Sequence, residues 1–294
     1  MIELGPLGLG TAPLAGLYEA VDDDTAHAVV ARAWELRIRV FDTAPYYGSG
    51  NAERRLGAAL RGLPRDEFLI STKVGRMLRP GPSGWPDAPP LEAYFDFSHD
   101  AALRSLEESL ERLGLDRVDI ALVHDPDDQY EEALTGSYRA LARLRDEGVV
   151  QAIGVGMNRP ELLCRFAREA DADCFLVAGR YTAIDRSAAD ELLPLCEERG
   201  ISVIAGGVFN SGVLAGGDTF DYGEVPPEIR ARVESLRETC ARRNVPMPAV
   251  AVQFPLRHPA VGSVLVGCRT PQEVEEDVRL FQLELPQALW DELA

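Results

Sequence analysis

Four side chains in the first half of the chain could together move a proton on a substrate oxygen. Three of them directly follow short apolar runs: Asp42 follows IRVF (38–41), Lys73 follows FLIST (68–72) and His124 follows DIALV (119–123), and Tyr47 comes five residues after Asp42. A tyrosine near its usual pKa of about 10 is a weak acid or base at neutral pH. We expect Lys73 to lower the pKa of Tyr47 and Asp42 to keep Lys73 charged. His124 would orient the substrate oxygen.

Taken singly, each of these residues has an ordinary structural explanation. A strand-end aspartate usually caps a loop, a lysine is usually solvated, and a histidine is usually a satisfied polar group. The combination favours catalysis, provided that the fold brings the four side chains together.

The elements that must position them alternate between strand and helix along the whole chain. Counting LGLGTA near the start, eight apolar runs are each followed by a loop and a helical pattern; the other seven are 38–41, 68–72, 119–123, 152–155, 174–178, 201–205 and 263–266. This rhythm predicts an α/β fold, a single-domain (β/α)8 TIM barrel over residues 1–294. Active sites of such barrels lie at the C-terminal ends of the strands, where the four side chains would meet.

One helix and one loop are predicted in more detail. Ser98 can cap a helix that has Leu103, Leu106, Leu110 and Leu113 on one face, and Gly114 can end it in the left-handed conformation. Residues 75–97 contain RPGPSGWPDAPP, which has too many prolines and glycines for a helix. We expect an extended loop there.

The motifs around the four side chains resemble those of a known family. FDTAPYYGSGNAERRLG, ISTKVGR and VDIALVHDPD are similar to the catalytic motifs of the aldo-keto reductases, in the same order along nearly the whole chain. The resemblance implies a nicotinamide cofactor and hydride transfer to or from a small carbonyl substrate. It also implies that Tyr47 is the general acid or base, that Lys73 and Asp42 tune it, and that His124 orients the substrate.

The same resemblance implies where the cofactor lies. Asn158 stands where the family has an asparagine that binds the nicotinamide carboxamide, and Arg180 stands where it usually has glutamine. GGVFNSGVL resembles the pyrophosphate loop and VGCRTPQEVEEDV the adenosine end. The implied contacts in these two segments are Gly207, Phe209, Asn210, Ser211, Gly212, Leu214, Gly267, Arg269, Glu273 and Asp277. The opening GLGTAP imitates a dinucleotide fingerprint, but Pro13 occupies the position of the third glycine.

Charge at the adenosine end favours NAD over NADP. Relatives that prefer NADP commonly present basic residues to the 2′-phosphate, whereas this chain has Gly267 and Glu273 there. A carboxylate repels a phosphate and can accept a hydrogen bond from a ribose hydroxyl. Arg269 is the cation that remains.

Within the family, the pattern is similar to bacterial dehydrogenases of L-fucose and other D-threo-aldoses and to pyridoxal 4-dehydrogenase. The resemblance implies oxidation of a cyclic hemiacetal to a lactone. Candidate substrate contacts lie in the loops after the first four strands: Tyr18, Tyr46, Trp85 and Asp125. Alternatives are an NADPH-dependent reductase of small aldehydes or ketones, a nicotinamide-binding regulatory barrel like the potassium-channel β subunits, and a metal-dependent barrel of unrelated chemistry.

Composition limits the partners. The net charge of −18 argues against a nucleic-acid or anionic-membrane partner, since either would select a basic face. The five cysteines show no zinc or disulfide spacing, and no metal site is expected. No targeting segment or long apolar run is evident, so we expect a cytoplasmic protein that acts on a sugar or aldehyde. A homo-oligomer is compatible with the sequence.

Overall fold

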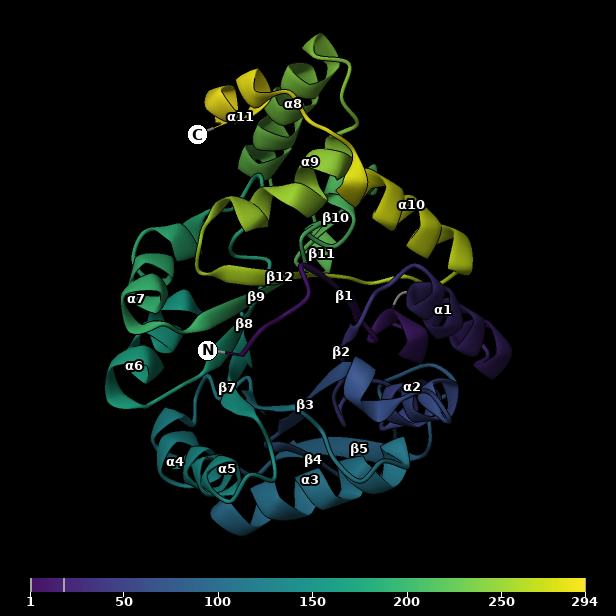
Figure 1. The fold of residues 1–294 in the computed structure, drawn as a ribbon, viewed down its shortest axis with the longest axis vertical. Helices are drawn as coiled ribbons and strands as arrows, with labels where there is room; N and C mark the ends of the chain where they lie inside the picture. The colour runs from purple at the N-terminus through teal and green to yellow at the C-terminus, as the bar shows by residue number, and fades with distance from the viewer. Residues whose placement is uncertain (1, 18, 294) are drawn as a thin grey trace.

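The computed structural model describes residues 2–17 and 19–293, and it contains a closed barrel of eight parallel strands (Figure 1). In chain order the barrel strands are β1 (Leu7–Gly10), β2 (Val40–Asp42), β3 (Leu69–Val74), β6 (Ile120–His124), β7 (Ala152–Met157), β8 (Cys174–Ala178), β9 (Ser202–Gly206) and β12 (Val261–Val266). Around the ring the order is β1-β12-β9-β8-β7-β6-β3-β2. All eight predicted runs form these strands, which confirms the (β/α)8 fold.

Helices surround the ring of strands on its outer side (Figure 1). They are α1 (Asp23–Glu35), α2 (Asn51–Leu60), α3 (His99–Leu113), α4 (Tyr130–Thr135), α5 (Ser137–Asp146), α6 (Pro160–Glu169), α7 (Leu192–Arg199), α8 (Pro227–Arg242), α9 (Met247–Gln253), α10 (Pro271–Gln282) and α11 (Gln287–Leu293). Helix α3 begins and ends as predicted. The Ser98 side chain accepts a hydrogen bond from the backbone N–H of Ala101, and Gly114 is left-handed with a φ of 63°.

The barrel has two apolar layers, because successive side chains of a strand point to opposite faces of the sheet. The inner layer includes Ile120 and Leu122 of β6 and Leu176 of β8, and Ile2 and Leu4 pack against it. The outer layer joins the strands to the helices and is far larger. A strand end can therefore direct a polar side chain into the barrel mouth while its neighbours anchor it on both faces.

The expectation of an irregular loop at 75–97 is wrong in part. Strands β4 (Arg76–Pro80) and β5 (Leu91–Phe95) form an antiparallel hairpin in register from Arg76↔Phe95 to Pro80↔Leu91. Most of the prolines and glycines lie in the connection 81–90, and Pro80 stands at the end of its strand, where a missing N–H is tolerated. The prolines and glycines of residues 81–90 therefore led to the prediction of a loop, although the segments on either side of them pair as strands.

A second hairpin, β10 (Thr219–Phe220) and β11 (Gly223–Glu224), follows β9. Its two connecting residues, Asp221 and Tyr222, have φ values of 46° and 63°. Tight two-residue hairpin turns often require positive φ at both central positions. Across the described part of the chain, no helix combines the length and apolar character needed to span a membrane.

Candidate active site

The ammonium of Lys73 is the centre of the polar cluster at the barrel mouth. Its Nζ lies 2.7 and 3.0 Å from the two carboxylate oxygens of Asp42, 2.9 Å from the carbonyl oxygen of Thr43 and 3.1 Å from the hydroxyl of Tyr47. Lys73 and Asp42 are buried. A Cβ added to Gly156 of β7 would lie 3.5 Å from Cε of Lys73, so the lysine stem crosses the barrel interior. The structure thus brings together the three predicted residues.

Burial and charge act in opposite directions on these three groups. Burial raises the pKa of the Asp42 carboxyl, against the attraction of Lys73. Burial also opposes the charge on Lys73, but Asp42 and Tyr47 outweigh it and raise the pKa of the ammonium. Lys73 therefore stays positively charged across the physiological pH range.

The predicted lowering of the pKa of Tyr47 is wrong for the protein alone. Burial of the phenol raises its pKa above the ordinary value of 10.0, and the charge of Asp42 adds to this effect. Lys73 lowers the pKa of Tyr47 as expected, but it only offsets part of the rise. The reason is that a phenolate loses hydration in the barrel mouth, a cost that the sequence does not reveal.

His124 ends β6 beside this cluster. Its ring lies edge-on to that of Tyr47, with 5.9 Å between the centroids. Burial holds the pKa of His124 well below 6.5, and the charges of Lys73 and Arg76 lower it further. Its Nδ1 is buried without a hydrogen-bond partner among the residues that the structure describes. A neutral imidazole at this place can orient a substrate oxygen without competing for the proton.

Tyr46, Trp85 and Asp125, three of the four candidate substrate contacts, lie around the same mouth. The rings of Tyr46 and Trp85 are 5.3 Å apart in an edge-to-face arrangement, and Tyr46 lies 6.2 Å from the imidazole of His124. Oδ2 of Asp125 is 3.6 Å from Nε2 of His124. The fourth candidate, Tyr18, lies outside the described residues.

Sequence reasoning missed Arg76, the first residue of β4. Its guanidinium pairs with Asp125 at 2.5 Å and lies over the ring of Tyr46, 4.5 Å from the centroid. The signal available in the sequence was its position three residues after Lys73. This position did not indicate a site residue, because the sequence predicts an irregular loop over residues 75–97.

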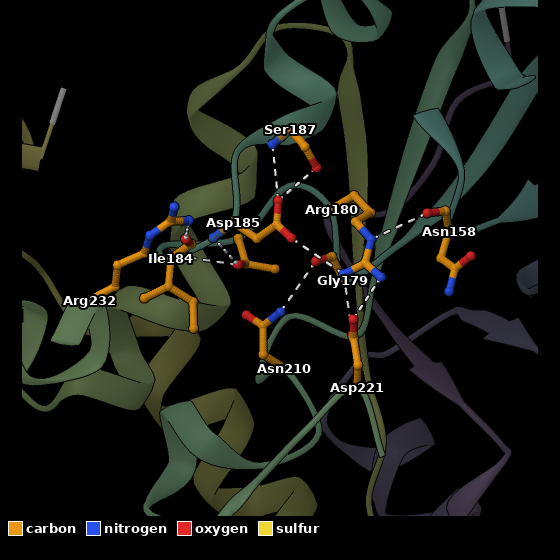
Figure 2. Close-up of polar contacts among 10 residues, drawn as sticks. Asn158, Gly179, Arg180, Ile184, Asp185, Ser187, Asn210, Asp221 and Arg232 are labelled. Atoms are coloured by element: carbon orange, nitrogen blue, oxygen red, sulfur yellow. Dashed lines mark hydrogen bonds and ion pairs between the residues drawn. The ribbon is translucent and has the colours of Figure 1, made fainter. Parts of the chain in front are cut away.

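Arg180, two residues after the end of β8, is held by carboxylates (Figure 2). Its guanidinium binds Asp221 through two hydrogen bonds of 2.7 and 3.2 Å, and Asp185 at 3.3 Å. Its Nε donates to the backbone carbonyl of Asn158 at 3.3 Å. The side-chain amide of Asn158 makes no hydrogen bond within the described residues, so it is the better of the two predicted nicotinamide contacts.

The predicted pyrophosphate loop follows β9 directly. Nδ2 of Asn210 donates to the carbonyl of Gly179 at 3.2 Å, and Asn210, Ser211 and Gly212 are consecutive left-handed residues. The backbone N–H groups of Asn210 and Gly212 are already used inside the loop, where they donate to the carbonyls of Gly207 at 2.8 Å and Phe209 at 3.0 Å. Gly207, Phe209, Ser211 and Gly212 keep some exposed surface, whereas Leu214 is buried in the apolar core and cannot touch a ligand directly.

The predicted adenosine end lies where β12 leads into α10. The Arg269 guanidinium pairs with Glu273 at 2.8 Å and with Glu19 at 3.1 Å, and the backbone N–H of Arg269 donates to Glu273 at 2.7 Å. Oδ2 of Asp277 lies 3.4 Å from the Cys268 sulfur, and burial raises the pKa of Asp277 to about 7. The exposed Gly267 adds no side chain. Carboxylates therefore dominate this end.

The residues present fit a nicotinamide dinucleotide along the rim. An unpartnered amide at Asn158 and a carboxylate at Glu273 match the needs of a carboxamide and a ribose hydroxyl, and the loop 207–212 keeps surface exposed at Gly207, Ser211 and Gly212. All five cysteines are buried and unpaired. Within the described residues, no group of three or more His, Cys, Asp or Glu side chains is arranged to hold a metal.

A closed (β/α)8 barrel whose mouth joins a buried lysine, an aspartate and a tyrosine beside a neutral histidine defines a class of hydride-transferring barrel enzymes. Residues 6–294 match the aldo/keto reductase family, and the chain belongs to that family. It is an NAD(P)-dependent oxidoreductase.

Similar proteins include two bacterial dehydrogenases. A D-threo-aldose 1-dehydrogenase from a Pseudomonas species is 43% identical over 304 residues, covering 98% of this chain and 92% of that protein. A pyridoxal 4-dehydrogenase from Microbacterium luteolum is 41% identical over 316 residues, covering 98% and 92%.

Solved structures share the fold. An aldo-keto reductase from Bacillus halodurans in its holo form has a TM-score of 0.80 at 24% identity, covering 100% of this chain and 93% of that chain. A glycerol dehydrogenase from Gluconobacter oxydans has a TM-score of 0.79 at 24% identity, covering 99% and 90%.

Proposed function

We propose that this enzyme oxidises the cyclic hemiacetal of an aldose of the L-fucose or D-threo type to its lactone, with NAD as the oxidant. The observation that carries the chemistry is the 3.1 Å contact between Nζ of Lys73 and the hydroxyl of Tyr47, at a barrel mouth where the rings of Tyr46 and Trp85 lie close by. The substrate class is supported by the 43% identity to a D-threo-aldose 1-dehydrogenase. Pyridoxal is a second candidate, supported by the 41% relative.

In this proposal Tyr47 is the general base and His124 orients the anomeric hydroxyl. Tyr47 takes the hydroxyl proton while the anomeric C–H bond breaks, and the C–O bond becomes the lactone carbonyl. A bound nicotinamide would accept the hydride that leaves the anomeric carbon. Lys73 stabilises the phenolate form of Tyr47, and the paired carboxylate of Asp42 holds Lys73 in place.

Asn158 would hold the nicotinamide carboxamide, and the loop 207–212 would hold the pyrophosphate. Arg180 is a poorer candidate for direct contact because Asp185 and Asp221 already use its guanidinium. The preference for NAD is supported by Arg269, whose charge is paired with Glu19 and Glu273, so that a 2′-phosphate would meet carboxylates.

The remaining partner and location proposals follow from composition. A net charge of −18 accords with a small-molecule substrate and no nucleic-acid partner. The buried free cysteines accord with a reducing compartment such as the cytoplasm. A homo-oligomer remains compatible with both.

Two measurements on the purified protein test the proposal. Protein-fluorescence titrations with NAD and NADP should give tighter binding of NAD. Turnover assays should then detect lactone formation with NAD and L-fucose or another aldose from a panel that also contains pyridoxal and simple aldehydes. Reduction of aldehydes with NADPH and no sugar oxidation would contradict the proposal, and tight cofactor binding without any turnover would favour a regulatory barrel.

A further inference from the structure

The ion pair between Arg76 and Asp125 is a second polar feature of the mouth that the proton-transfer chemistry does not use. It joins the hairpin β4–β5 to the end of β6, at a distance of 2.5 Å. Both side chains keep some exposure, 19% for Arg76 and 26% for Asp125. The pair lies beside His124, whose Nε2 is 3.6 Å from Oδ2 of Asp125, and it is less enclosed than the Lys73–Asp42 pair, whose side chains are 2% and 5% exposed.

The pair is incompletely satisfied. Nε of Arg76 is buried without a hydrogen-bond partner among the described residues. Within the same residues, Oδ1 of Asp125 has no partner, and only Oδ2 is engaged, by Arg76 and at 3.6 Å from His124. Asp125 has a φ of 44°, in the left-handed region that aspartate adopts more readily than most residues other than glycine. Nε of Arg76 is enclosed, whereas a ligand can reach Oδ1 of Asp125 without breaking the ion pair.

Charges around the mouth cancel. Lys73 is paired with Asp42 and Arg76 with Asp125, so the four groups carry two positive and two negative charges. Among the described residues, a phosphorylated or carboxylated substrate would find both cations near His124, Lys73 and Arg76, already paired. A neutral substrate would find one carboxylate acceptor and a guanidinium donor side by side, which is the pattern that two neighbouring hydroxyl groups can satisfy.

We infer that Arg76 and Asp125 form a hydroxyl-binding subsite that selects neutral polyhydroxylated substrates over hemiacetals and aldehydes without neighbouring hydroxyls. Asp125 accepts a hydrogen bond from one hydroxyl and Arg76 donates to the next, while Tyr46 and Trp85 supply the apolar wall. This inference rests on the proposed aldose oxidation and names the residues that recognise the sugar.

The decisive test compares two substrates that react at the same group. The first is the best aldose of the panel, and the second is 2-hydroxytetrahydropyran, a cyclic hemiacetal with no other hydroxyl. Asp125→Asn should lower kcat/KM for the aldose by about 10- to 100-fold, as expected for loss of a charged hydrogen bond. The same change should lower kcat/KM for 2-hydroxytetrahydropyran by less than about 3-fold. Arg76→Gln should give the same imbalance.

Glu92→Gln is the matched control. It breaks the Arg79–Glu92 ion pair on the same hairpin, where Nε of Arg79 lies 2.7 Å from Glu92, and Arg79 is largely exposed. It should leave the ratio of the two kcat/KM values unchanged. If Asp125→Asn lowered kcat/KM equally for both substrates, or for neither, the inference would be overturned. The ion pair would then only hold the hairpin against the end of β6.

The unmodified enzyme provides an independent test if a variant does not fold. Its kcat/KM for the aldose should exceed that for 2-hydroxytetrahydropyran by at least about 10-fold. Equal values would overturn the inference while leaving the proposed oxidation intact. Protein that oxidises neither substrate with NAD would instead contradict the proposed function itself.

Discussion

The ammonium of Lys73 lies 3.1 Å from the hydroxyl of Tyr47. The same ammonium also contacts the carboxylate of Asp42 at 2.7 Å and the carbonyl oxygen of Thr43 at 2.9 Å. All of its donors therefore have acceptors inside the barrel mouth. This arrangement leaves the lysine charged and the tyrosine protonated in the protein alone, because burial raises the pKa of Tyr47. A reaction that uses the phenolate form of Tyr47 therefore depends on the positive charge of Lys73, which opposes the effect of burial on this pKa.

Replacing Tyr47 by phenylalanine should remove the proton-transfer group and leave its ring. Loss of a positioned general acid or base typically costs about 10²- to 10⁴-fold in rate. We expect kcat for lactone formation to fall by that amount, with the dissociation constant for NAD, measured by fluorescence quenching, changed by less than about 2-fold. A Tyr47→Phe protein with full activity would remove the assigned role.

Oxidation should become faster as the pH rises. The phenolate fraction of Tyr47 grows tenfold for each pH unit below its pKa, and that pKa is raised above 10.0. We expect log(kcat/KM) for the aldose to rise with a slope near one between about pH 6 and 9. His124 should add no ionisation there, since its pKa is held well below 6.5.

Lys73→Met should move the same rise to higher pH, because the substitution removes the charge that lowers the pKa of Tyr47. The measurement is the pH profile of kcat/KM for both proteins. A plateau already reached at pH 7 in the unmodified enzyme would contradict this account of Tyr47.

Glu273→Gln should weaken the preference for NAD. The change removes the negative charge that pairs with Arg269 and leaves that guanidinium with Glu19 as its charged partner at this end. We expect the ratio of NADP to NAD dissociation constants to fall by about 10-fold, corresponding to one charged interaction. Fluorescence titrations with both cofactors measure the ratio. Glu276→Gln, which changes an exposed carboxylate of the same helix paired with Arg279, is the control.

Asp277→Asn should stabilise the protein without cofactor at alkaline pH. Burial raises the pKa of Asp277 from 3.8 to about 7, so the folded protein holds this proton more tightly than the unfolded chain does. Stability from this group is present at acidic pH and is lost as the pH rises to 7. The gain in free energy of unfolding on Asp277→Asn should be larger at pH 8 than at pH 5 by about 2 kcal/mol, measured by urea denaturation. An equal gain at both pH values would contradict the shifted ionisation.

Glu53 supports the site from outside the barrel. Its fully buried carboxylate accepts hydrogen bonds from Thr72 at 2.7 Å and Arg112 at 2.6 Å, which joins α2 to β3 and α3. Glu53→Ala should lower the free energy of unfolding by about 3 kcal/mol, because breaking a buried pair leaves unsatisfied groups behind. Glu108→Ala removes the more exposed partner of Arg112, 3.7 Å away, and should cost less than about 1 kcal/mol. Equal losses would show that the burial of Glu53 adds nothing.

Sequence reasoning located the lysine cluster because of a local rule. Asp42 and Lys73 each come directly after an apolar run, and parallel strands of a barrel end at the same rim. The same reasoning could not find Arg76, because its hairpin pairs residues across a connection rich in proline and glycine. It could not find the partners of Arg180 either, since Asp221 lies 41 residues further along the chain.

The order of apolar runs and the residue after each one determined the barrel, its mouth and the chemical types that gather there. Only the tertiary structure decided that Arg76 faces Asp125, that Leu214 is buried and that the pKa of Tyr47 rises. The physical reason is that periodicity is a local property of the chain. Pairing between distant side chains and the loss of hydration on burial depend on the packed molecule as a whole.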